Sequence, residues 1–139
     1  MNKKLKKKKI LKLFGINILL YSLLFGLVTL NKQVFRPAFN HSQLGSILTG
    51  SFPNFIAAYL INLCIVNGVW IRKPKFGRPI VYGLALIITA VLVHEEFKSI
   101  WGASTYFDAY DIVGSLTGSL LAVLTYEYLY FRKNHKLKI

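Results

Sequence analysis

Four long apolar runs alternate with charged joints along this chain of 139 residues. The runs cover about residues 10–30, 52–71, 79–96 and 109–131. A helix needs about 20 mostly apolar residues to cross the hydrocarbon core of a bilayer. The pattern therefore predicts an all-α integral membrane protein, a four-helix bundle whose two termini lie on the same side of the membrane.

The basic residues lie mainly on one side of this predicted topology. All of the 18 Lys and Arg except Lys32, Arg36 and Lys98 fall in the N-terminal segment, the joint between the second and third runs, or the C-terminal tail. Because cytoplasmic loops retain Lys and Arg, this distribution predicts an N-in and C-in orientation. We expect residues 1–9 to form a solvated cytoplasmic tail whose lysines attract anionic lipid, at about 1 kcal/mol each.

The net charge of +13 is also typical of proteins that bind nucleic acid. Here the charges flank apolar runs and lack interleaved aromatic side chains, so membrane insertion explains them and we expect no nucleic acid partner. The first run is longer than a usual signal-peptide core and ends without a small-x-small cleavage pattern, which favours a retained helix. Since the spans leave no room for a soluble domain, we expect residues 1–139 to form a single transmembrane domain.

Four of the five acidic residues gather at the predicted outer ends of the last two spans: Glu95, Glu96, Asp108 and Asp111. A carboxylate at membrane depth costs a few kcal/mol unless it faces protein, water or a cation, so such residues are functional candidates. We predict that Glu96, Asp108 and Asp111 form a ligand-binding pocket. The alternative is that these acids mark the membrane interface, where Asp108 also suits the N-cap of the last helix.

Small residues follow Asp111 along one face of the last predicted helix, at spacings of three and four. They are Gly114, Ser115, Gly118, Ser119 and Ala122. A G-x-x-x-G step such as the one from Gly114 to Gly118 lets a neighbouring backbone approach closely. We expect Gly114, Ser115 and Gly118 to support the acidic site by drawing the last two spans together, with packing inside the monomer favoured over a homodimer contact.

The stretch from Glu96 to Gly118 resembles the C-terminal signature of VanZ-like membrane proteins. In that family one helix ends in Glu, and a Phe-Asp-x-x-Asp-like segment opens the last helix, with a Gly seven residues beyond the second Asp. Phe107, Asp108, Asp111 and Gly118 stand at those positions here. The resemblance implies a four-helix protein of the bacterial cell envelope, in the cytoplasmic membrane, from a family whose named member is linked to glycopeptide antibiotic resistance.

The chain also departs from the family pattern. Ser99, Thr105 and Ser115 stand where the family usually has Gln, Arg and Asn. Near the start of the second helix the family has an acidic residue, and Asn54 is the candidate for that position here. We therefore interpret the chain as a divergent member, whose resemblance is carried by residues 96–118.

Polar residues inside the other runs are few. Asn17, Asn62 and Asn67 favour interhelical hydrogen bonds, worth about 0.6 kcal/mol apiece, over the lining of a polar path. The single cysteine, Cys64, suits a packing role. Glu127, near the inner end of the last run, is expected at the interface or paired with Arg132 or Lys133.

Sequence motifs of enzymes are lacking. There is no G-x-S-x-G, no H-E-x-x-H and no phosphate-binding glycine loop ahead of a Lys. His94 beside two glutamates has no second ligand at metal-binding spacing. The sequence favours a protein without catalysis, cofactor or metal.

Three functions are compatible with these features. The first is a VanZ-like protein whose extracytoplasmic acidic pocket binds an envelope ligand or protein partner, with the outer segment 31–51 lying across the helix ends as a cap. The second is a small transporter or channel, in which Asn17, Asn62 and Asn67 continue the acidic site inward. The third is a non-catalytic accessory subunit of a larger envelope complex.

Overall fold

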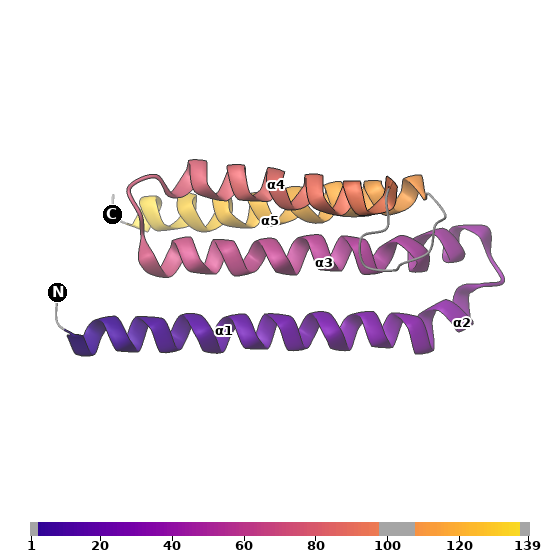
Figure 1. Cartoon of the computed structure of the whole chain (residues 1–139), viewed down its shortest axis with the longest axis horizontal. Coiled ribbons are helices and arrows are strands. Elements are labelled where there is room, and N and C mark those ends of the chain that lie inside the picture. Colours follow the sequence, from indigo (N-terminus) through magenta and orange to yellow (C-terminus); the bar gives the residue numbers. More distant parts are fainter. Residues whose placement is uncertain (1–2, 98–107, 137–139) are drawn as a thin grey trace.

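The computed structural model describes residues 3–97 and 108–136 (Figure 1). Within these ranges the regular elements are all helices: α1 (Lys3–Leu30), the π-helical segment η1 (Asn31–Phe35), α2 (Arg36–Phe39), α3 (Gln43–Arg72), α4 (Gly77–Phe97) and α5 (Ala109–Lys136). Four stretches are long and apolar enough to cross a membrane: Lys7–Phe39, Gln43–Arg72, Gly77–Phe97 and Ala109–Arg132. The predicted all-helical class and the four spans are confirmed.

Helix α3 is the centre of the arrangement. It packs against α5, α4 and α1, whereas the described part of α1 contacts neither α4 nor α5. Figure 1 shows α1 running alongside α3 with the α4 and α5 pair on the other side. The bundle is therefore a core of three helices with a fourth helix flanking it. In the most apolar stretch of α1, no residue is buried by other parts of the protein, as expected for a helix that faces lipid.

The buried core changes in character along α3. Near the turn into α4 it consists of larger apolar side chains, Val66, Val69, Val81 and Tyr126. Further along, the contact between α3 and α5 uses small residues, which are Ala58, Ser115, Ser119 and Ala122, each at most 5% exposed. Small side chains let two helix backbones approach closely, so α3 and α5 form the tightest pair in the core.

The segment 31–51 does not lie loosely across the helix ends as expected. The first helix continues through η1 and α2, and the chain reverses before α3 begins. Pro53 lacks an N–H and so leaves the Thr49 carbonyl without its usual partner inside α3. Asn31 Nδ2 donates to this carbonyl oxygen at 2.7 Å, and Arg36 Nε donates to it at 3.4 Å. These bonds tie the outer segment to the side of α3.

Helices α1 and α5 place the two ends of the described chain at the same end of the molecule (Figure 1). This matches an even number of crossings. Helix α1 begins at Lys3 and so includes the whole lysine run. The link between α4 and α5 falls outside the described residues, and with it the family positions Ser99, Thr105 and Phe107.

Candidate functional site

The acidic residues predicted to form a site come from the facing ends of two helices. Glu96 lies in the last turn of α4, and Asp111 lies in the first turn of α5. Asn54 of α3 donates a hydrogen bond from Nδ2 to Glu96 Oε1 at 2.9 Å. The Asp111 carboxylate interacts with Glu96 electrostatically and is also within reach of the Asn54 side chain. The structure thus brings Glu96 and Asp111 together around an amide from a third helix.

Asp108 is exposed and has a structural task at the start of α5. Its Oδ1 accepts a hydrogen bond from the Tyr110 N–H at 2.9 Å, and its carbonyl oxygen accepts one from the Asp111 N–H at 3.2 Å. A side chain that accepts from the second residue of a helix is an N-cap. Asp108 therefore caps α5 and also adds negative charge close to Asp111.

Asp111 is the least satisfied of the three carboxylates. Its Oδ1 atom is buried and has no hydrogen-bond partner in the described part of the chain. Leaving a buried charged acceptor without a donor costs more than leaving a neutral one. Arg36 attracts Asp111 electrostatically, but its guanidinium also donates to the carbonyl oxygens of Thr49 and Gly50. Among the described residues, Asp111 thus has two neighbouring carboxylates and one guanidinium.

The two glycines of α5 face α3, not α4. A Cβ built on Gly114 would lie 2.8 Å from the Ser51 carbonyl oxygen, and one built on Gly118 would overlap the carbonyl oxygen of Phe55. The expectation that this face draws the last two spans together therefore needs correction. Its neighbour is the second span, and this contact places Asn54 beside the start of α5.

A buried polar cluster lies further along the same face of α5. The Ser119 hydroxyl accepts a hydrogen bond from Thr89 Oγ1 of α4 at 2.7 Å and one from Asn62 Nδ2 of α3 at 3.1 Å. Ser115, one turn closer to Asp111, is fully buried, and its hydroxyl has no partner among the described residues. The same holds for the Asn62 Oδ1 atom. Polar groups thus extend inward from the acidic site.

The asparagines of the flanking helix bond to each other. Asn67 Nδ2 of α3 donates to Asn17 Oδ1 of α1 at 2.8 Å. Together with the bond from Asn62 to Ser119, this gives the interhelical hydrogen bonds that the sequence favoured. Because α1 lies apart from α4 and α5, the Asn17 and Asn67 pair is separate from the buried cluster on α5.

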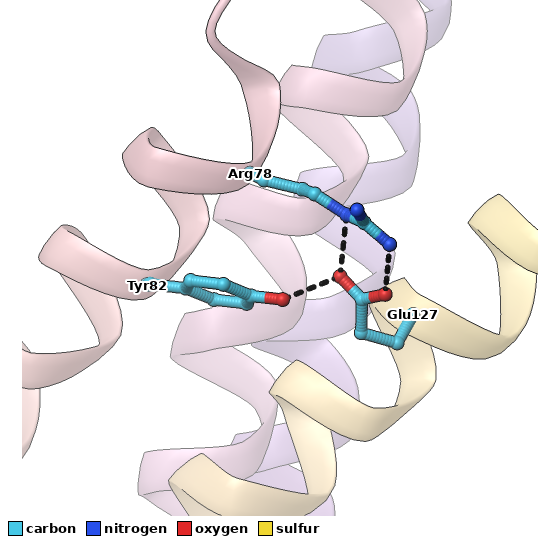
Figure 2. A network of polar contacts seen from close by, with 3 residues as sticks. All are labelled: Arg78, Tyr82 and Glu127. Carbon is cyan, nitrogen blue, oxygen red and sulfur yellow. Dashed lines mark hydrogen bonds and ion pairs between the residues drawn. The ribbon is translucent and has the colours of Figure 1, made fainter.

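A second charged cluster, drawn in Figure 2, lies near the start of α4, at the other end of this helix from Glu96. Arg78 Nε and Nη2 donate to the two carboxylate oxygens of Glu127 at 3.0 and 2.6 Å, and the Tyr82 hydroxyl donates to Glu127 Oε1 at 2.5 Å. In the described part of the chain the ion-pair partner of Glu127 is Arg78, not Arg132; the Lys133 side chain lies outside the described residues. The pairing with Arg78 could have been predicted from the topology. Consecutive spans run antiparallel, so an Arg near the start of α4 lies beside a Glu near the end of α5.

Sequence reasoning also missed the role of Arg36, which it counted only as a charge on the outer side. The missing N–H of Pro53 is a signal for it, since a carbonyl freed inside a helix attracts donors from nearby segments. In the described ranges, no group of three or more His, Cys, Asp or Glu side chains is arranged to hold a metal ion.

Comparison with known proteins yields no relative for this chain: no family model, no curated protein and no solved structure matches it. The VanZ-like resemblance stays a prediction from the residues that carry it.

Proposed function

We propose that this chain is a VanZ-like integral membrane protein of the bacterial cytoplasmic membrane, with both termini inside. Its extracytoplasmic site, built from Glu96, Asp108 and Asp111, binds an envelope ligand or protein partner that carries cationic or hydrogen-bond-donating groups. The observation that supports this proposal most is the buried Asp111 Oδ1 atom, which has no donor in the described part of the chain and lies next to a second carboxylate.

A cationic ligand suits this arrangement for two reasons. An ammonium or guanidinium group would supply a donor to the Asp111 Oδ1 atom, which has none among the described residues, in a charge-assisted hydrogen bond of the stronger kind. It would also relieve the repulsion between Asp111 and Glu96, which Arg36 offsets only in part. Asn54 holds Glu96 in place from α3, so the site is preorganised on three helices.

The test uses Glu96→Gln and Asp111→Asn, which remove one charge each and keep the size of the side chain. In a bacterial host with a measurable envelope phenotype, each variant should accumulate in the membrane normally and lose activity. Asp108→Asn removes the exposed charge of the site and keeps the N-cap, because Asn is as good an N-cap as Asp; its effect should be smaller than that of the other two variants. Full activity of both Glu96→Gln and Asp111→Asn would contradict the proposal.

A small transporter or channel is the second candidate. Asp111, Ser115 and Ser119 follow one another at intervals of one turn, and the buried oxygens of Ser115 and Asn62 have no protein partner in the described ranges. Unpaired buried oxygens in a row are what a line of bound water or a permeating ion requires. This candidate predicts flux through proteoliposomes that Asn62→Leu reduces and Asn67→Leu leaves unchanged, because Asn67 is engaged with Asn17. Sealed vesicles without flux would exclude it.

A further inference from the structure

A pocket of about 290 Å³ lies at the turn between α3 and α4. Its walls include three basic and four aromatic side chains, which are Lys73, Lys75, Arg78, Trp70, Phe76, Tyr126 and Tyr130. Since α4 runs from this turn to Glu96, the pocket lies at the end of the molecule away from the acidic site. Figure 1 shows that α1 begins and α5 ends at this same end.

The pocket carries positive charge. No carboxylate belongs to the lining that the described residues form. Arg78 is neutralised by Glu127, and its guanidinium lies over the Tyr130 ring at 4.3 Å from the ring centroid, so it forms a fixed part of the wall. Lys75 Nζ lies 5.7 Å from the centroid of the Phe76 ring. Because Glu127 neutralises Arg78, the positive charges in the pocket wall that an anion can use are those of Lys73 and Lys75.

Lys73 occupies a backbone conformation that lysine rarely adopts. It is the C-cap of α3 with φ 50° and ψ 57°, the left-handed region, and its N–H donates to the Val69 carbonyl oxygen at 2.8 Å. Glycine is the usual residue in such a cap because it has no Cβ. A lysine in this strained backbone conformation, on the wall of a pocket, indicates that its positive charge has a function there.

The level of the pocket in the bilayer indicates the kind of anion. The turn joins the end of the α3 span to the start of the α4 span. The pocket therefore lies at the level where lipid headgroups meet the ends of these helices. Trp and Tyr side chains, such as Trp70 and Tyr130 here, favour this level. Basic pockets between spanning helices are known to hold anionic lipid headgroups.

We propose that this pocket binds the headgroup phosphate of an anionic phospholipid, with Lys73 and Lys75 as the charged contacts. The site is distinct from the acidic site of the proposed function and from the general attraction of lipid to the lysines of residues 1–9. A soluble phosphate compound shares the chemistry of this ligand, so the experiment has to separate the two sources.

The test is native mass spectrometry of the purified full chain in micelles doped with phosphatidylglycerol or with phosphatidylcholine. The intact protein should retain phosphatidylglycerol in preference to phosphatidylcholine. Lys73→Gly should lower this retention by at least about ten-fold, the loss expected for a charge-assisted contact. Lys73→Arg should preserve it. Because glycine suits the left-handed cap, Lys73→Gly should melt at or above the temperature of the natural chain, so misfolding would not explain its loss.

The matched control is Lys9→Ala, which removes one exposed charge from the same end of the molecule. Its effect should stay within about five-fold, the size of a general surface attraction. Equal retention by Lys73→Gly and the natural chain, or equal losses for Lys73→Gly and Lys9→Ala, would overturn the proposal. Adding glycerol 3-phosphate distinguishes a lipid from a soluble phosphate compound. If the site binds lipid, the protein keeps its phosphatidylglycerol. Displacement of phosphatidylglycerol by glycerol 3-phosphate at a concentration equal to that of the protein would overturn the assignment to lipid.

Discussion

Asn54 on α3 donates a 2.9 Å hydrogen bond to Glu96 on α4, across 42 residues of sequence. This bond fixes a carboxylate beside Asp111, which lies on a third helix. The candidate site therefore depends on a neutral amide as much as on its acids.

Removal of that amide should disturb both stability and function. Asn54→Ala leaves Glu96 without its donor, so the free energy of unfolding should fall by about 1 to 2 kcal/mol, and the envelope phenotype should weaken. Unfolding in detergent micelles and the phenotype assay measure the two effects. Asn67→Ala serves as the control, since it removes an amide of α3 that is far from the acids. Unchanged activity in Asn54→Ala would contradict a positioning role.

The close contact between α3 and α5 predicts a sharp response to one methyl group. Gly118→Ala places a Cβ against the Phe55 carbonyl oxygen, and a Cβ there would also lie 3.0 Å from the Ala58 Cβ. Because a backbone atom blocks the space, the helices must shift, at a cost of about 2 kcal/mol or more in the free energy of unfolding. Gly83→Ala is the control, because nothing lies within 4 Å of its added Cβ. Equal stability of the two variants would show that the helices do not meet here.

The pair of Arg78 and Glu127 should contribute to stability in spite of partial exposure. The two side chains are 42% and 19% exposed, so solvent weakens the pair, but its bidentate geometry strengthens it. We expect a measurable favourable coupling free energy from a double-mutant cycle with Arg78→Ala and Glu127→Ala. The same cycle with Arg132→Ala should give about zero, and a larger coupling to Arg132 than to Arg78 would contradict the structure.

The hydrogen bond between Asn17 and Asn67 is predicted to link α1 to the core weakly. Asn17→Ala and Asn67→Ala should each lower the free energy of unfolding by about 0.6 kcal/mol. The double variant should lose no more than Asn67→Ala alone, since that variant already removes the bond to Asn17 as well as the longer bond from Asn67 Nδ2 to the Leu13 carbonyl oxygen. If the decreases in the free energy of unfolding of the two single variants add in the double variant, the two asparagines make separate contacts.

The spans and several local features could be predicted from the sequence, because they depend on neighbouring residues. Apolar runs of sufficient length fix the spanning helices whatever their partners are. The cap that Asp108 forms for α5 follows from its place just before a helical run. The small face of α5 is likewise visible in the spacing of Gly114 and Gly118.

The partners of these features could not be predicted, because they depend on which helices lie side by side. The glycine face was expected to meet α4 and meets α3. Glu127 bonds Arg78, which lies 49 residues earlier, although basic residues follow it in the sequence. Several pairings of four antiparallel helices satisfy the same apolar pattern, so residue contacts between them need the structure.

The proposed function requires the acidic site to lie outside the cell. The chain has one cysteine, so Cys64→Ser gives a background without thiols. In it, Asp108→Cys and Lys75→Cys place single thiols at exposed positions on opposite ends of the spans. A membrane-impermeant thiol reagent added to intact cells should label position 108 at once and position 75 only after the membrane is permeabilised. Labelling of position 75 in intact cells, with position 108 protected until permeabilisation, would contradict the extracytoplasmic site.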